Sequence, residues 1–523
     1  MTAFADDSTR RLIPRWRYSF STDLTAEHTG LARRGRLQPE STPALDAAES
    51  GFLENPTLVS AAELVACGAA YQEPTRAYEA ALYLLERRGE VRAAVARQAE
   101  WITGAPLDVR EPHTIASGAD LSSARTAAEG VIRTRRAQLE LWPRDPIGWI
   151  DLARAYAVIG QVDKARRAVN AALQLAPNHR VVLRVAARFA FHSGRPDEAY
   201  ARISRHPRTR SDPWLMSSEL ALAQIVDRSP RFCRAARAIL EERSHAPGHL
   251  SELAGAAATL DLGAGKHRRA RSLFRQSLED PTENALAQVE WARKTDSSLS
   301  IPEKALEVPY SYEANYWRAR RAADWNAALA GARDWLLDEP YSSRPAIFGS
   351  SIAAMALHDY PLAEEFARAG LVADSRDNSL WNNLAVALAK RDRPWDAARA
   401  FSKIEMSPES SLPRFVANAT RGLIAFRLGQ PEIGRRWYDE ADTGAPDGEM
   451  RKLVLLHWAA EELRLAPARA RQLLERTAYD EGATADPLIA QLRDGLERQL
   501  ESGKSDEAVH PPPDGKPALA GPT

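Results

Sequence analysis

The four residues Gly263–Lys266 come nearest to a phosphate-binding loop in this chain of 523 residues. In such a loop another glycine lies five positions before the Gly-Lys pair, and Ser or Thr follows the lysine. Here Leu260 and His267 occupy those two positions. The segment also falls between two helical patterns rather than after a strand, so we predict a turn between helices.

Two histidines, His245 and His249, have the i, i+4 spacing that could place both imidazoles on one helix face to bind a metal ion. Pro247 lies between them and no glutamate follows His245, so we predict a loop with solvent-exposed histidines. The two cysteines, Cys67 and Cys233, lie far apart in the sequence. They exclude a disulfide framework and are predicted to be buried or half-buried thiols.

Paired carboxylates could share acid and base roles, and the chain has such pairs at Glu364–Glu365 and Glu461–Glu462. Neighbouring residues of a helix point in different directions, so we predict that these pairs lie on solvated helix surfaces. No strand is evident on which a nucleophile elbow or a dinucleotide motif could be placed. We therefore predict no catalytic, cofactor-binding or metal-binding residues, and no enzymatic activity.

The composition favours a soluble protein without a strong charge preference. Lys plus Arg and Asp plus Glu each number 70, so no net charge directs the whole chain to nucleic acid or anionic lipid. Hydrophobic residues make up 44%, enough for an extended core. The N-terminus lacks the apolar stretch of a secretory signal, and no window approaches the ~20 apolar residues of a membrane span. These features predict a cytoplasmic protein.

Helical patterns occupy most of the chain between two irregular ends. Residues 1–50 are predicted to form a basic, partly disordered arm in which Trp16 and Tyr18 lie among arginines. Residues 502–523 are rich in Pro and Gly and are predicted to be disordered. Between these ends, amphipathic segments of about 10 to 20 residues are separated by short Pro, Gly or Asp turns.

One pattern recurs in these helical segments. Its first clear copy ends at Pro177 and has Gly160 at the turn between two helices. In this copy the packing positions are Trp149, Leu152, Ala153, Tyr156, Ala165, Val169 and Ala172. A second copy has Trp381, Leu384, Ala385, Leu388, Ala397, Phe401 and Ile404, and a third has Gly422, Ala425, Gly429, Gly434, Tyr438, Ala441 and Pro446.

The pattern resembles the tetratricopeptide repeat, which has Trp, Leu, small and Tyr positions, then Ala, bulky and Ala positions and a closing Pro over about 34 residues. Small residues allow the two helices of a hairpin to approach closely. The resemblance covers residues 146–475 and implies an all-α fold, a right-handed α-solenoid of stacked helical hairpins. The predicted domains are the arm at 1–50, degenerate hairpins at 51–145, repeats at 146–293, a hinge at 294–309, repeats and capping helices at 310–501, and the tail at 502–523.

In such a stack the first helix of each repeat lines a concave groove, which is the surface that the resemblance implies for a protein partner. Basic and aromatic types prevail at the groove positions, so we predict a scaffold that binds an acidic peptide segment. The alternative, ordinary solvated positions in an Arg-rich protein, stays open. The predicted groove residues are Arg154, Arg184, Arg188, His192, Trp317, Arg320, Arg321, Phe348, Asn382, Lys390, Phe426 and Arg427.

Two other functions stay open at this point. Residues 10–36 could bind nucleic acid, because their arginines could contact phosphates and their aromatic rings could stack on bases. The chain could also be a non-catalytic subunit of a larger enzyme complex. The sequence predicts neither a cofactor nor a membrane partner, and it does not identify the protein partner.

Overall fold

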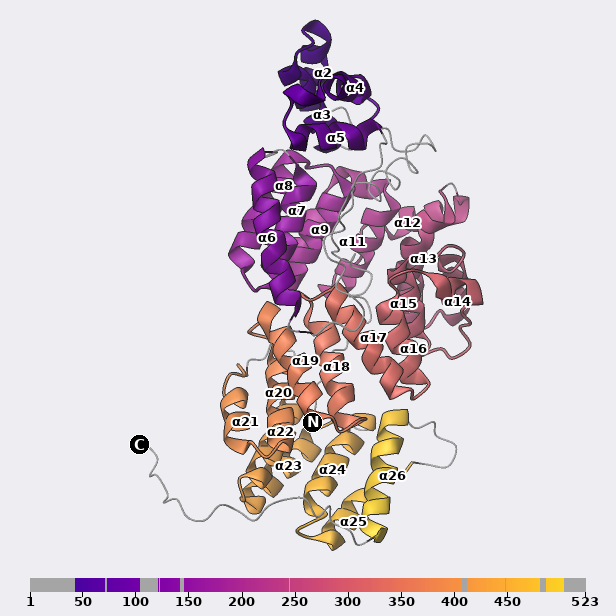
Figure 1. The fold of residues 1–523 in the computed structure, drawn as a ribbon. Coiled ribbons are helices and arrows are strands. Elements are labelled where there is room, and N and C mark those ends of the chain that lie inside the picture. Colours follow the sequence, from indigo (N-terminus) through magenta and orange to yellow (C-terminus); the bar gives the residue numbers. More distant parts are fainter. Residues whose placement is uncertain are drawn as a thin grey trace. The chain divides into compact units, whose positions relative to one another are not determined.

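The computed structural model describes residues 43–502 apart from residues 71–72, 104–120, 122, 142–144, 244, 407–411, 447 and 480–485. This part of the chain consists of α-helices, short 3-10 helices and turns, without any strand (Figure 1). The first helices are α2 (Pro43–Glu54), α3 (Leu58–Ala70), α4 (Tyr78–Glu86), α5 (Ala93–Thr103), α6 (Ser123–Leu141), α7 (Pro146–Val158), α8 (Val162–Leu175), α9 (Arg180–His192) and α10 (Pro196–Ser204).

The remaining helices continue at similar lengths to residue 502. Those of the middle part are α11 (Pro213–Ile225), α12 (Cys233–Glu242), α13 (Pro247–Gly263), α14 (His267–Ser277), α15 (Glu283–Ala292), α16 (Tyr312–Arg321), α17 (Trp325–Asp338), α18 (Ser343–Met355) and α19 (Tyr360–Ala373). The last are α20 (Asn378–Lys390), α21 (Pro394–Phe401), α22 (Arg414–Arg427), α23 (Pro431–Gly444), α24 (Glu449–Glu462), α25 (Pro467–Glu475) and α26 (Pro487–Ser502). The 3-10 helices are η2 (Arg88–Glu90), η3 (Pro207–Arg210) and η4 (Glu303–Glu307).

These helices pack as hairpins in chain order (Figure 1). α7 packs on α8, α9 on α10, α13 on α14, α16 on α17, α18 on α19, α22 on α23 and α24 on α25. The first helices of successive hairpins also touch, as α7 does with α9, α11 with α13 and α22 with α24. The predicted all-α fold of stacked helical hairpins is confirmed.

Aspartate followed by proline begins several helices. Asp145 precedes Pro146 of α7, and its carboxylate accepts a backbone amide of the first turn at 2.9 Å. Asp212 stands in the same relation to Pro213 of α11, with a corresponding bond of 3.0 Å. The carboxylate satisfies an amide that the helix leaves unpaired, and proline has no amide to satisfy there. These local sequence signals set where the first helices start.

The turns inside the hairpins share one backbone feature, a residue in the left-handed region. At Gly160, with φ of +73°, the chain reverses and the amide of Gln161 donates to the carbonyl of Tyr156 at 2.9 Å. This bond satisfies a carbonyl at the helix end and favours glycine, because a Cβ is strained at positive φ. The same turn position is occupied by Gly160, Gly194, Asp227, Gly265, Ala323, His358, Asp392 and Gly429.

The first and second helices of a hairpin differ in burial. Every residue of α7 except Trp149 is buried, and α18 is buried from Arg344 to its end. In α8, by contrast, only Ala165, Ala168, Val169 and Ala172 are buried. First helices thus lie between neighbours, while second helices bury one stripe and keep a solvent-exposed face.

The close approach predicted for the third repeat is confirmed between α22 and α23. A Cβ added to Gly422 would lie 2.6 Å from a ring carbon of Tyr438, and one added to Gly434 would lie 2.4 Å from a ring carbon of Phe426. Both distances are well inside van der Waals contact, so the crossing has room only for glycine at these two positions.

The chain divides into two compact units, an N-terminal unit that ends at Leu384 and a C-terminal unit that begins at Ala385. The predicted hinge at 294–309 lies inside the N-terminal unit, where Leu299 and Ala305 are buried in an apolar cluster with residues of α13 to α16. Helix α2 begins within the predicted arm, but residues 1–42 and the tail from 503 onward lie outside the described residues. The predicted domain limits stay predictions.

Candidate functional site

None of the twelve predicted groove residues is solvent-exposed. A groove that binds an acidic partner needs accessible cations, so the contacts of each side chain decide which of these residues could serve in one. The buried ones are Arg154, Arg184, Arg188, Trp317, Phe348, Asn382 and Phe426. The half-buried ones are His192, Arg320, Arg321, Lys390 and Arg427.

Three of these residues, on α7 and α9, surround a distant segment of the same unit, residues 338–341. The guanidinium of Arg154 donates to the carbonyl oxygen of Asp338 at 2.5 Å, and that of Arg188 lies 3.5 Å from the carboxylate of Glu339. The imidazole of His192 meets the ring of Tyr341 edge-on, with centroids 5.5 Å apart. Helices α7 and α9 therefore contact a segment that lies about 150 to 180 residues later in the sequence, and predicted groove residues make these contacts.

Burial and nearby carboxylates act on the pKa of His192 in opposite directions. Burial lowers the pKa of His192 to about 4, and the charge of Arg188 acts in the same direction. The carboxylates of Asp374 and Glu339 oppose this shift without cancelling it. His192 is therefore neutral at neutral pH and adds no positive charge to the predicted groove.

Other predicted groove arginines pair with carboxylates of other hairpins. Arg184 of α9 lies 2.6 Å from Glu252 of α13, and both side chains are buried. Arg321 lies 2.5 Å from Glu290, which is 31 residues earlier, about one repeat length away. The predicted cations are thus largely neutralised within the fold.

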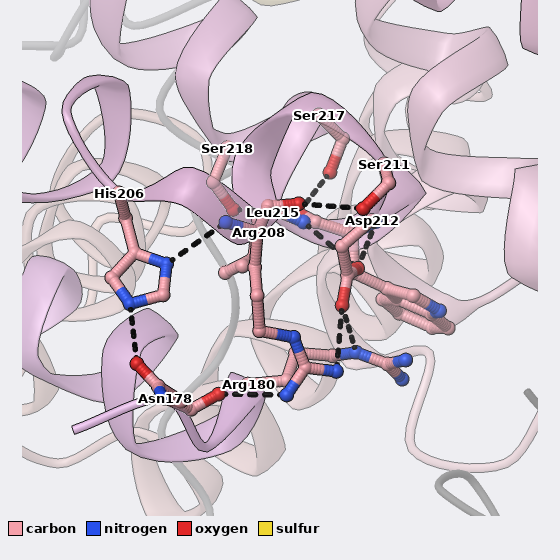
Figure 2. A network of polar contacts seen from close by, with 10 residues as sticks. Asn178, Arg180, His206, Arg208, Ser211, Asp212, Leu215, Ser217 and Ser218 are labelled. Carbon is pink, nitrogen blue, oxygen red and sulfur yellow. Dashed lines mark hydrogen bonds and ion pairs between the residues drawn. The ribbon is translucent and has the colours of Figure 1, made fainter. Parts of the chain in front are cut away.

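A related polar network joins α9 to the start of α11. Figure 2 shows Arg180 and Arg208 pointing toward the buried carboxylate of Asp212, at 2.8 Å and 3.8 Å. Arg208 also donates to the carbonyl of Asn178 at 2.7 Å, and the imidazole of His206 lies 3.2 Å from the side chain of Asn178. Burial alone would raise the pKa of Asp212, but the charge and hydrogen bond of Arg180, together with Arg208, lower it. Asp212 is therefore ionised and caps α11 while it binds both arginines.

The predicted groove aromatics pack against other aromatic rings. The ring centroids of Trp317 and Phe348 lie 5.2 Å apart, and the ring of Tyr316 stacks on that of Phe348 with centroids 5.3 Å apart. The indole of Trp317 donates to Glu313 at 3.2 Å. These contacts place Trp317 and Phe348 in a packed aromatic cluster between α16 and α18. A buried Trp suits this position when its indole N–H has a hydrogen-bond partner, as it has here.

Within the C-terminal unit, Lys390 and Arg427 converge on one carboxylate. Glu461 lies 2.6 Å from Lys390 and 3.0 Å from Arg427. Burial would raise the pKa of Glu461, but the two cations lower it, so the carboxylate stays ionised. Arg435 binds both carboxylate oxygens of the buried Glu462, at 2.7 and 2.8 Å.

The prediction of solvated carboxylates is therefore wrong at Glu461 and Glu462, and also at Glu364, which is buried and paired with Arg368 at 2.7 Å. The sequence held one signal that could have found such pairs. Arg427 and Glu461 are 34 residues apart, the repeat length, so the two lie at nearly equivalent positions of successive hairpins.

The other sequence candidates fall in structural positions. Gly263–Lys266 spans the end of α13 and the turn into α14, as predicted. The prediction for His245 is wrong, since this side chain is buried. Among the described residues, no group of three or more His, Cys, Asp or Glu side chains could hold a metal ion. None of the described helices is long and apolar enough to traverse a membrane.

Comparison with known proteins identifies one element of this arrangement. Residues 146–189, which are α7, α8 and most of α9, match the family model of the tetratricopeptide repeat. The chain contains a tetratricopeptide repeat. This match confirms the resemblance at the copy with Trp149 and Tyr156. A repeat of this family generally serves protein interaction. No curated protein matches the sequence.

Several solved structures are similar to the chain at low identity. One is the Cut9–Hcn1 hetero-tetramer of the APC/C, with 12% identity, a TM-score of 0.42, and coverage of 91% of this chain and 96% of that chain. Another is yeast Tom70, with 13% identity, a TM-score of 0.30, and coverage of 73% and 96%. A third is a human IFIT1 dimer with PPP-AAAA, with 15% identity, a TM-score of 0.37, and coverage of 72% and 95%.

Proposed function

We propose that this chain is a non-catalytic scaffold that holds one or more protein partners. The observation that carries the proposal is the tetratricopeptide repeat at residues 146–189, set in a row of hairpins whose second helices keep a solvent-exposed face. Each hairpin is too small to bury its own apolar face, so the stack presents an extended surface with room for partners.

Site-specific photo-crosslinking in the cells that make the protein tests this proposal. A photoreactive residue replaces Arg167 on the exposed face of α8, and in a matched control it replaces Ala165 on the buried face of the same helix. We expect discrete protein adducts from exposed positions along several second helices and none from the buried control. The absence of adducts at every exposed position would contradict a scaffold.

We propose also that cations of the first helices recognise acidic segments, as predicted for the groove. Support comes from the chain itself, because Arg188 lies 3.5 Å from the carboxylate of its own Glu339 and Arg154 donates to the backbone carbonyl of the adjacent Asp338. The half-buried Arg320 allows a test, since Arg320→Gln removes charge without inserting acid and leaves the Arg321–Glu290 pair intact. Weaker capture of a cross-linked partner, with unchanged helical circular dichroism, is expected. Full capture would contradict this role.

Nucleic-acid binding through residues 10–36 remains the second candidate, and this segment lies outside the described residues. Salt-dependent retention on nucleic acid that is lost on deletion of residues 1–40 would favour it. A constitutive enzyme partner at fixed stoichiometry would instead indicate a non-catalytic subunit.

A further inference from the structure

The outer face of α14 carries a concentrated row of cations. Between Gly263 and Ser277 the sequence has no acidic residue, while Lys266, Arg268, Arg269, Arg271 and Arg275 are all exposed. Together with Arg237 of α12 they make up what we call the α14 ridge. The chain as a whole has equal numbers of acidic and basic residues, so this local excess is not a consequence of its composition.

Helix packing determines which side chains face outward. Ala270, Phe274 and Ser277 form the buried stripe of α14. Arg268, Arg271 and Arg275, spaced by three and four residues, lie on the opposite stripe. The row spans seven residues, which is about 10 Å along a helix that rises 1.5 Å per residue.

Nearby carboxylates neutralise the ridge only in part. The buried carboxylate of Asp261 is shared by Arg237 at 3.2 Å, Arg269 at 3.3 Å and Lys266 at 3.9 Å. Asp296 is bound by Arg271 at 2.6 Å. The only further carboxylate within ion-pair distance, among the described residues, is the exposed Glu241, 3.9 Å from Arg269.

Arg268 and Arg275 have no carboxylate partner in the described part of the chain, so six cations face three carboxylates. A partner with complementary charge would be attracted to this face over about one Debye length.

We propose that the α14 ridge docks an extended acidic segment of a protein partner. The choice of carboxylate rests on the ridge itself, where three of the four arginine–carboxylate contacts are shorter than 3.5 Å. Planar guanidinium groups also have the geometry to bind a carboxylate through two N–H donors. Phe274, the only Phe, Tyr or Trp of α14, is buried, and His267 is the only exposed ring of this helix. The helix therefore offers one small ring for base stacking, whereas single-stranded nucleic acid stacks successive bases on aromatic side chains.

The spacing also suits an extended peptide. Alternate residues of a strand lie about 6.6 Å apart on the same side, close to the axial steps of about 4.5 and 6 Å between successive ridge arginines. Acidic residues at alternate positions of the partner could therefore each meet one guanidinium. This inference rests on the proposed scaffold function, for which it names a surface and a partner chemistry.

The test compares two double variants of the full chain with equal charge change. Arg268→Glu/Arg275→Glu alters the ridge at the two arginines without acidic partners, and Arg133→Glu/Arg136→Glu alters two exposed arginines of α6 as the control. Binding of a rhodamine-labelled peptide of alternating Glu and Ser is measured by fluorescence anisotropy at low and physiological ionic strength. Oligo-dT and a DNA duplex of equal charge are the comparison probes.

We expect the ridge variant to bind the peptide about tenfold or more weakly than the unmodified chain, and the control variant to bind it unchanged within about twofold. Equal peptide binding by the two variants would overturn the proposal. The proposal would also be overturned if either DNA probe bound more tightly than the peptide and this binding were lost in the ridge variant. The surface would then be assigned to nucleic acid. If the ridge variant keeps its photo-crosslinked partners, the ridge proposal fails while the scaffold stands. If the unmodified chain has no such partners, the scaffold itself fails.

Discussion

At the scale of single residues, arginines of the first helices form buried ion pairs with carboxylates far away in the sequence. Two arginines of α9 form such pairs, Arg184 with Glu252 of α13 and Arg188 with Glu339, and all four side chains are buried. Removing one member of such a pair leaves an uncompensated charge away from water, which costs far more than the pair contributes to stability. These arginines therefore influence folding first, and any effect on binding must be separated from that.

Replacing Arg184 by Met should lower the free energy of unfolding by about 3 to 5 kcal/mol, because Glu252 loses its cation. Urea unfolding followed by circular dichroism measures the change. The matched control is Arg167→Met on the exposed face of α8, which should stay within about 0.5 kcal/mol. A similar small loss at both positions would show that the buried pair is not formed.

The depressed pKa of His192 leads to a pH prediction. Its folded value of about 4 lies below an unfolded value of about 6.5, so the unfolded chain binds more protons between these pH values. Stability should therefore be full above about pH 6.5 and fall by about 1 to 3 kcal/mol toward pH 4. Unfolding of His192→Gln over the same range isolates this term. If the variant loses as much stability as the unmodified chain, His192 does not contribute.

At the scale of elements, the hairpin turn is the repeated unit that keeps the register of the stack. Gly160 and Gly194 are 34 residues apart, as are His358 and Asp392, and all four occupy the same left-handed turn position. Glycine suits this position, while other residues pay a conformational cost of about 1 kcal/mol or more. The turn therefore persists in degenerate repeats because the hydrogen bonds around it outweigh that cost.

Replacing Ala323 by Gly should raise the free energy of unfolding by about 1 kcal/mol, since φ at this residue is +54°. The same change at Ala319, inside the preceding helix α16, should lower it by about 0.5 to 1 kcal/mol. Thermal or urea unfolding of the two variants gives the comparison. Destabilisation of both would mean that Ala323 is not held in the left-handed region.

At the scale of the molecule, the N-terminal unit is more than a row of neighbours. A stack in which each hairpin contacts only the next would have energetics limited to adjacent repeats. Here residues 338–341 contact α7 and α9 across more than 145 residues of sequence, and Tyr341 is fully buried in the same apolar cluster as Tyr156. Distant hairpins of this unit are therefore coupled directly.

Replacing Tyr341 by Ala should weaken this closure and so increase amide hydrogen exchange in both α17–α18 and α7–α9. Mass spectrometry of the exchanged peptides locates the effect. The comparison variant is Phe274→Ala, a buried residue of α14, whose effect should stay near α13 to α15. Increased exchange confined to α17 and α18 after the Tyr341 change would indicate that the contact of residues 338–341 with α7 and α9 does not stabilise these two helices.

The sequence alone determined the helical fold, the turn between helices at Gly263–Lys266 and the repeat at residues 146–189. These depend on neighbours within one or two hairpins, such as the Asp145 cap, the Gly160 turn and the small residues Gly422 and Gly434. Only the tertiary structure decided which charges are available. Arg188 and Glu339 are 151 residues apart, and no local period places one beside the other. Helical periodicity specifies which way a side chain points from its own helix, but its partner depends on where the rest of the chain returns.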